Sequence, residues 1–231
     1  MKVGILKTGS PPQAALAAHG DYPAMFRRLL GEADYEWRTY AVDEGELPAR
    51  PEECDAYIVT GSSAGVYDPL PWIAPAKDFL RAAKGKAKLV GICFGHQLMA
   101  EAFGGQVIKS PKGWGVGAHD YEVFSAEPWM DGAGPVRMPA SHQDQVVVLP
   151  PNAEAIAGNA FAPLGAIAYR DQPAISIQLH PEFEPAYAID LIETRRGSRY
   201  GEDQADRAIA SYSGSDDRAR VAGWIRNFLE G

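Results

Sequence analysis

Short apolar runs alternate with helical patterns through the first hundred residues, and this alternation limits the possible folds more than any other feature. The strand-like runs are Val3–Leu6, Trp37–Val42, Ala56–Thr60 and Leu89–Cys93, and the helical patterns are Pro23–Leu30, Trp72–Ala83 and His96–Phe103. Strands that alternate with helices predict a parallel sheet covered on both faces. We therefore expect functional side chains at the carboxyl ends of those strands.

The pattern changes to successive strand-like runs between Gln106 and Leu179. These runs are Trp114–Phe124, Val136–Ala140, Gln145–Leu149, Ala153–Ala157, Ala166–Arg170 and Ala174–Leu179, and they predict a β-rich continuation of the sheet or a small antiparallel annex. The tail returns to helix over Pro185–Arg196, Asp203–Tyr212 and Asp216–Leu229. No repeat or linker marks a boundary, so we expect residues 1–231 to form one α/β domain.

Charge and cysteine content limit the partners and the compartment. The 30 acidic and 22 basic side chains leave a net charge of −8, and no Lys/Arg cluster could follow a phosphate backbone. No apolar run reaches membrane-span length, and the N-terminal run is too short for a signal peptide. The two cysteines, Cys54 and Cys93, stand in unrelated contexts, which favours a reducing compartment. We expect a soluble, cytoplasmic protein that binds neither nucleic acid nor membrane.

The segment Leu89–Gln97 (LVGICFGHQ) is an apolar strand that ends in a cysteine, with a glycine two residues away on each side. This layout predicts a nucleophile elbow, in which a tight strand-to-helix turn projects the Cys93 side chain above the sheet. The helix N-terminus favours a thiolate, and the free N–H of Phe94 faces a developing oxyanion. The alternative is a buried structural cysteine. A zinc site is disfavoured because no second Cys/His pair has ligand spacing, so we expect no metal.

A second polar motif, His180-Pro181-Glu182, follows the last apolar run. Residues two apart in an extended segment point to the same side, and Pro181 keeps the backbone out of a helix. Glu182 can then orient the His180 imidazole, which in turn activates a thiol. Alone, the pair is typical of a satisfied polar contact. Together with Cys93, it predicts a Cys–His–Glu triad.

These two motifs resemble those of the class I glutamine amidotransferase family: Gly91–Gln97 resembles its nucleophile motif, and His180–Phe183 its second motif. The resemblance covers the chain from the first strand to about Phe183. It implies a flavodoxin-like three-layer sandwich with a mostly parallel sheet. It also implies that a γ-glutamyl amide is cleaved through a γ-glutamyl thioester, without a cofactor, and that the acyl group passes to water or another acceptor.

The resemblance extends to an oxyanion loop after the strand Ala56–Thr60. Gly61 and Ser62 stand where the family has a pair of glycines, so the backbone N–H of Ser62 would be the second oxyanion donor beside that of Phe94. Ser62 replaces the second glycine, and its Cβ restricts either the loop or the substrates admitted. Without the resemblance, Gly61-Ser62-Ser63 is also typical of a turn after a strand.

Further segments resemble family positions near the substrate. Ser141, His142 and Asp144 match a Ser-His-x-Asp loop that holds the α-amino and α-carboxylate groups of the glutamyl moiety, and Gln97 would brace the same pocket. Trp114, in the segment Lys112–Gly117, is either a substrate contact or a sheet-packing residue.

Three functions remain open. The first is a stand-alone γ-glutamyl hydrolase or peptidase that acts on a small γ-glutamyl molecule, which Gly61–Ser63 and Tyr67–Trp72 favour by their resemblance to the γ-glutamyl peptidase branch. The second is a glutaminase subunit that delivers ammonia to a separate synthetase, since the chain has no G-x-x-x-x-G-K-S/T phosphate loop of its own. The third is a non-catalytic binding or stress protein on a flavodoxin-like scaffold. An oriented base at His180 disfavours it.

Overall fold

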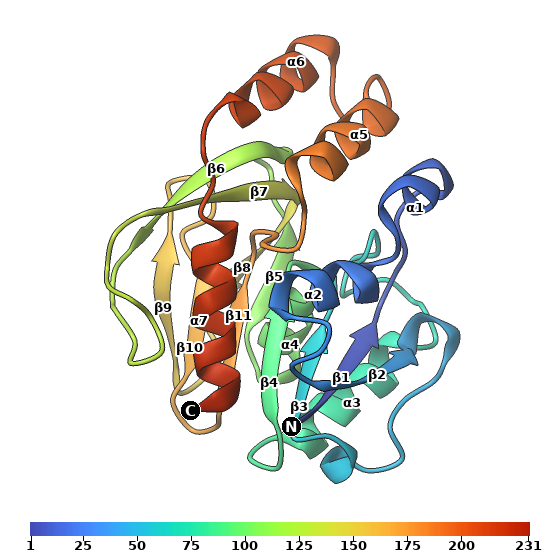
Figure 1. The fold of residues 1–231 in the computed structure, drawn as a ribbon, viewed down its shortest axis with the longest axis vertical. Coiled ribbons are helices and arrows are strands. Elements are labelled where there is room, and N and C mark those ends of the chain that lie inside the picture. Colours follow the sequence, from blue (N-terminus) through green and yellow to red (C-terminus); the bar gives the residue numbers. More distant parts are fainter.

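The N-terminal apolar runs form the parallel part of a central sheet in a computed structural model, which describes residues 1–231 (Figure 1). Five strands lie in the order β2, β1, β3, β4, β11, and every neighbouring pair is parallel. Their bounds are β1 Lys2–Lys7, β2 Glu36–Ala41, β3 Ala56–Val59, β4 Lys88–Ile92 and β11 Ala174–Ile177. Every residue of β3 and β11 is buried, as expected for strands covered on both faces.

Four antiparallel strands continue the sheet beyond β11, in the order β10, β9, β6, β7. They span Ala166–Tyr169 (β10), Ala153–Gly158 (β9), Gly115–Val123 (β6) and Val136–His142 (β7). A separate two-stranded antiparallel sheet joins β5 (Gln106–Lys109) to β8 (Asp144–Val148). The predicted α/β fold is therefore confirmed. Most of the strands between Gln106 and Leu179 continue the central sheet, and β5 and β8 form the small antiparallel annex.

Helices cover the two faces of the sheet. On one face, α2 (Tyr22–Leu30) and α7 (Arg218–Glu230) bury side chains in the same hydrophobic core as Val3 and Ile5 of β1. On the other face, α3 (Ile73–Ala83) and α4 (Phe94–Ala102) bury side chains in the same hydrophobic core as Leu6 of β1. Alternate residues of one strand thus contribute to two different cores. None of the helices is long and apolar enough to cross a lipid bilayer.

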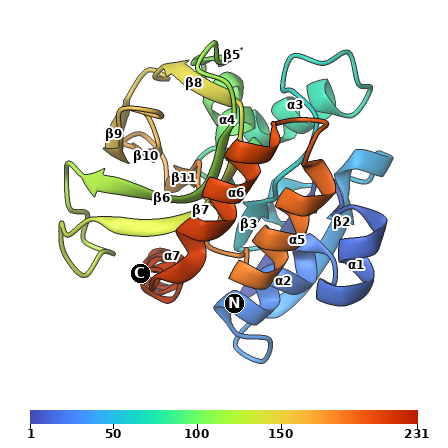
Figure 2. The same cartoon turned by 90° about the horizontal axis from the view of Figure 1, so that it is seen from above.

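Two further helices lie beyond the carboxyl ends of the parallel strands. Figure 1 shows α5 (Pro185–Arg195) and α6 (Glu202–Ala210) above these strand ends, and Figure 2 shows them from above, where α5 lies over α2 and α6 runs toward the β6–β7 pair. Functional groups are expected at this edge of the sheet. The tail is thus part of the surroundings of the candidate site.

Among the α-helices and strands, two were not predicted from the sequence, namely α1 (Gln13–His19) and β5. Only Ala15 is buried in α1, and only Val107 is buried in β5. Short elements with a single buried residue carry almost no periodic hydrophobic signal, so the pattern along the chain does not reveal them.

Candidate active site

Cys93 occupies the turn between β4 and α4 with φ 54° and ψ −104°. A positive φ is unusual for a residue with a side chain and costs about 1–3 kcal/mol. The flanking glycines make this turn possible. A Cβ at Gly95 would collide with the carbonyl oxygen of Val59, and a Cβ at Gly91 would lie 2.6 Å from the carbonyl oxygen of Gly95. The structure therefore has the geometry of a nucleophile elbow at Cys93.

The strand β11 brings His180 to the same edge of the sheet. It pairs with β4 in parallel, and the N–H of Cys93 donates to the carbonyl oxygen of Ile177 at 2.8 Å. His180 and Glu182 follow directly, and Nδ1 of His180 hydrogen bonds to Oε1 of Glu182 at 2.8 Å. Both side chains are buried. The imidazole also stacks on the Phe183 ring, with centroids 3.8 Å apart, so its orientation is held from two sides.

The electrostatics of this pair differ from those of an ordinary buried histidine. Burial alone would lower the pKa of His180, but the neighbouring Cys93 and Glu182 act in the opposite direction and raise it to about 10. Nε2 of His180 has no hydrogen-bond partner and remains available. A Cβ built on Gly61 would lie 3.3 Å from Cε1 of His180 and 4.0 Å from Cβ of Cys93, so the thiol and the imidazole flank the same glycine.

Two backbone donors lie near the thiol. Phe94 is the first residue of α4, so its N–H has no acceptor within the helix. The N–H of Ser62 donates to no protein atom, while its hydroxyl accepts a hydrogen bond from the N–H of Ala64 at 3.2 Å. Ser62 and Gly61 line a small cavity together with Cys93 and His180. Free N–H groups beside a nucleophile are suited to stabilising an oxyanion.

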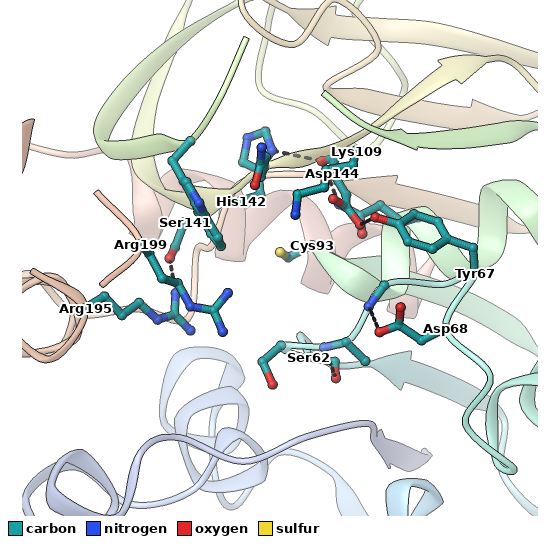
Figure 3. Close-up of a pocket in the computed structure, with 16 residues that line it drawn as sticks. Ser62, Tyr67, Asp68, Cys93, Lys109, Ser141, His142, Asp144, Arg195 and Arg199 are labelled. Atoms are coloured by element: carbon teal, nitrogen blue, oxygen red, sulfur yellow. Dashed lines mark hydrogen bonds between the residues drawn. The ribbon is translucent and has the colours of Figure 1, made fainter. Parts of the chain in front are cut away.

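A larger cavity of about 260 Å³ opens beside Cys93 (Figure 3). This volume lies just below the roughly 300–1,000 Å³ that is usual for small-molecule sites, which suits a ligand of amino-acid size. Six residues predicted as site residues line it, in addition to Cys93 itself: Ser62, Gln97, Trp114, Ser141, His142 and Asp144. Phe94 does not line it, since its ring packs against Trp72. Glu182 lies behind His180 and lines neither cavity.

The segment Ser141–Asp144 is held in place by hydrogen bonds. Nδ1 of His142 donates to the carbonyl oxygen of Asp144 at 3.1 Å, and burial lowers the pKa of His142 to about 3, so its imidazole is neutral. Nε2 of Gln97 donates to the same carbonyl oxygen at 2.9 Å and to Oε1 of Gln178 at 3.0 Å. Burial raises the pKa of Asp144, and the Tyr67 hydroxyl, which donates to it at 2.8 Å, opposes the rise.

The structure brings two arginines to the cavity that the sequence did not reveal. Nη1 of Arg195, at the end of α5, donates to the Ser141 hydroxyl at 2.8 Å. The guanidinium carbons of Arg195 and Arg199 lie 5.9 and 5.0 Å from the centroid of the Trp114 ring. Trp114 therefore lies at the cavity wall. The segment Thr194–Arg199 contains three arginines, and no pattern in it tells which of them face the cavity.

The alternative interpretation of Cys93 as a metal ligand has no structural support. Nδ1 of His96 pairs with the Ser176 hydroxyl at 2.9 Å, and His96 is fully buried and lines neither cavity. No group of three or more His, Cys, Asp or Glu side chains is arranged to hold a metal ion.

Residues 19–190 match the family model described as Glutamine amidotransferase class-I. Among individual relatives, a glutamine amidotransferase-like protein of Schizosaccharomyces pombe is 29% identical over 98% of each chain. Gamma-glutamyl peptidase 3 of Arabidopsis thaliana is 26% identical over 92% of this chain and 90% of its own length. One subunit of the glutamine-hydrolyzing GMP synthase of Methanococcoides burtonii is 27% identical over 71% of this chain and 83% of its own length.

A solved structure has the same fold. The glutamine amido transferase from Methylobacillus flagellatus superimposes with a TM-score of 0.78 at 20% identity, over 99% of this chain and 92% of that one. Its sheet and covering helices therefore match those described above.

Proposed function

The chain belongs to the class I glutamine amidotransferase family, and from that premise we propose that it cleaves a γ-glutamyl amide through a γ-glutamyl thioester on Cys93. One observation carries the proposal: a strained cysteine and a histidine held by a buried carboxylate flank Gly61, at the edge of a polar cavity. A solvated surface pair would have neither the burial nor the backbone strain.

In the proposed reaction, the Cys93 thiolate attacks the γ-carbonyl carbon of the substrate. The N–H groups of Ser62 and Phe94 stabilise the resulting oxyanion. His180, oriented by Glu182, gives its proton to the departing nitrogen, and the amine or ammonia leaves a thioester behind. His180 then takes a proton from a water molecule, which attacks the thioester and releases glutamate, so that the Cys93 thiolate and the protonated His180 are regenerated.

The larger cavity supplies groups for the glutamyl moiety. Asp144 and Asp68 are suited to its α-ammonium group, and Gln97 and His142 hold the Asp144 backbone in position. We further infer that residues 1–231 act as one domain. The segment after residue 190 lies outside the region matched by the family model. Its helix α7 shares a hydrophobic core with the sheet, and its Arg195 lines the larger cavity.

A second candidate function is the delivery of ammonia from glutamine to a separate synthetase. The relative from Methanococcoides burtonii favours it, because its name describes one subunit of a glutamine-hydrolyzing synthase. The relative named gamma-glutamyl peptidase 3 matches more of this chain and favours the stand-alone reaction. The two functions share the thioester and differ in the substrate and in the need for a partner.

The experiment incubates the purified protein with glutamine and with a set of γ-glutamyl amino acids and peptides, and measures intact mass after rapid acid quenching. We expect a γ-glutamyl adduct on Cys93 and release of glutamate. Cys93→Ser and His180→Ala should lower turnover by more than about 1,000-fold. Cys54→Ser is the matched control, since Cys54 is a buried free cysteine outside the site, and it should retain activity.

Each outcome separates the candidates. Turnover of γ-glutamyl peptides by the isolated protein supports the stand-alone enzyme. Activity with glutamine that appears only once a synthetase has been added supports the ammonia-delivering function. If no substrate, with or without cell extract, yields an adduct on Cys93, the catalytic proposal is wrong.

A further inference from the structure

Arg195 and Arg199 present two positive charges to the cavity and have no carboxylate partner. Both line the cavity, and they lie against Trp114. The only side-chain hydrogen bond of Arg195 is the one to the Ser141 hydroxyl, and the Arg199 guanidinium makes none. Partial burial and the charge of Arg195 lower the pKa of Arg199, so the two guanidinium charges repel each other. An anion between them would relieve that repulsion.

The neighbouring Arg196 forms ion pairs with nearby carboxylates, whereas Arg195 and Arg199 do not. Arg196 pairs with Glu193 at 2.7 Å, Glu202 at 2.8 Å and Asp206 at 2.9 Å. Within a short stretch of chain, three arginines thus divide into Arg196, which is paired with three carboxylates and does not line the cavity, and Arg195 and Arg199, which line the cavity without a carboxylate partner. This division is the expected one when the unpaired guanidinium groups serve a ligand, because guanidinium forks match carboxylate oxygens.

The position of the arginines relative to Cys93 indicates which part of a substrate they meet. Figure 3 shows Arg195 and Arg199 on one side of Cys93, and Asp144, Tyr67 and Asp68 on the other. Arg195 also lines the small cavity shared by Cys93 and His180. The group that protonates the departing nitrogen lies on the leaving-group side of the thioester. Arg195 is therefore on the side of the leaving group, and the acidic residues are on the side of the glutamyl group.

We propose that Arg195 and Arg199 form a subsite for a carboxylate on the leaving group. The substrate class is then a γ-glutamyl amino acid or short γ-glutamyl peptide with a free carboxylate, rather than glutamine, whose leaving group is ammonia. Trp114 packs against both guanidinium groups, and Ser141 positions Arg195. This inference rests on the proposed γ-glutamyl thioester chemistry and adds the recognition of the leaving group to it.

The test compares substrates that differ only in the charge of the leaving group. These are γ-glutamylglycine with γ-glutamylglycinamide, and γ-glutamylalanylglycine with its C-terminal amide, with glutamine as a fifth substrate. We expect the wild type to favour the acid of at least one pair by about 10-fold to 100-fold in kcat/KM, the range of one or two charge-assisted hydrogen bonds. Arg195→Gln and Arg199→Gln should remove this preference while turnover of the amides stays within about 3-fold.

Two further variants test whether the preference depends on the guanidinium group of Arg199 and on the arginines that line the cavity. Arg199→Lys should retain part of the preference, because it keeps the charge and loses the planar fork. Arg196→Gln removes a paired arginine from the same segment and should leave the preference unchanged, whatever its effect on the melting temperature.

The outcomes distinguish this inference from the proposed function. Cleavage of acids and amides at equal rates by the wild type overturns the carboxylate subsite and leaves the thioester chemistry standing. An equal loss on acids, amides and glutamine in the two Arg→Gln variants also overturns it, since the arginines would then bind the α-carboxylate of the glutamyl group. Absence of any adduct on Cys93 contradicts the proposed function itself.

Discussion

The segment that follows β11 and the end of β7 each place a buried histidine at a cavity that Cys93 also lines, His180 at the small cavity and His142 at the larger one, and the two histidines differ in charge. His180 and His142 both bond through Nδ1 to a residue two positions further along, at 2.8 and 3.1 Å. In His180 the acceptor is the carboxylate of Glu182, and in His142 it is the backbone carbonyl of Asp144. The pKa of His180 is raised to about 10, whereas the pKa of His142 is lowered to about 3.

The difference teaches that burial does not decide the role of a histidine. Burial lowers the pKa of both imidazoles. A carboxylate on Nδ1 and the nearby Cys93 reverse the effect for His180, while the neutral carbonyl cannot do so for His142. We therefore expect His180 to carry and transfer a proton, and His142 to act as a fixed neutral donor that shapes the cavity.

Among changes to the surroundings of the two histidines, the largest expected effect comes from replacing the carboxylate partner of His180 by a neutral group, like the partner of His142. Glu182→Gln should lower kcat/KM by roughly 100-fold or more, and by less than Cys93→Ser, because an orienting group is less indispensable than the nucleophile. The variant should also lower the pKa of His180. Activity of the wild type should fall as pH rises through about 10, where the imidazolium loses its proton, and this fall should move to lower pH in the variant.

The measurement is a pH–rate profile from about pH 5.5 to about pH 10.5 on one γ-glutamyl substrate. Glu184→Gln is the control, since Glu184 is two residues further along and largely exposed. It should change neither the rate nor the profile. An alkaline fall at the same pH in Glu182→Gln and wild type would contradict the proposed coupling of this carboxylate to His180.

A smaller effect is expected from adding a side chain at Gly61, which lies beside both the thiol and His180. His142 does not lie near this glycine. Gly61→Ala adds a Cβ 3.3 Å from Cε1 of His180, so the imidazole must shift by a few tenths of an ångström. We expect kcat to fall by about 10-fold with little change in KM, because displacement of a catalytic group by about 1 Å can cost roughly 100-fold. Steady-state kinetics with the same substrate measure it.

Gly223→Ala is the matched control for this substitution. Gly223 lies in α7 with open space around its Cα, so the added methyl group should leave turnover unchanged and stabilise the helix by up to about 1 kcal/mol. Equal kcat values for Gly61→Ala and wild type would show that the catalytic arrangement of the thiol and the imidazole does not require a glycine at position 61.

The two histidine segments also show how far the sequence determines the site. The alternation of strands and helices predicts the sheet, and Gly91–Gln97 with His180–Glu182 predicts three side chains at its carboxyl edge. Within each motif the residues are consecutive or nearly so, and their geometry follows from local backbone rules. The different charge states of His180 and His142 do not follow from such rules, because they depend on which atoms pack around each ring in the folded chain.

The arginine side of the cavity was not predictable for a related reason. Arg195, Arg196 and Arg199 are chemically identical in the sequence, and only the docking of α5 and α6 above the sheet decides which of them meets Trp114 and which meets Glu202. The elements α1 and β5 were missed because each buries a single side chain. Local motifs therefore predict the reacting groups, and tertiary packing determines what surrounds them.

The smallest expected effect comes from replacing the neutral histidine. His142→Asn removes the ring and offers an amide N–H in place of the Nδ1 donor, so the hydrogen bond to Asp144 is partly retained. We expect KM to rise by about 2-fold to 10-fold, the range of one net hydrogen bond, with little change in kcat. Because a histidine with a pKa of about 3 stays neutral across the whole pH–rate profile, the shape of that profile should be the same in variant and wild type. Loss of an ionisation near neutral pH in His142→Asn would show that His142 titrates during the reaction, and the contrast with His180 would then fail.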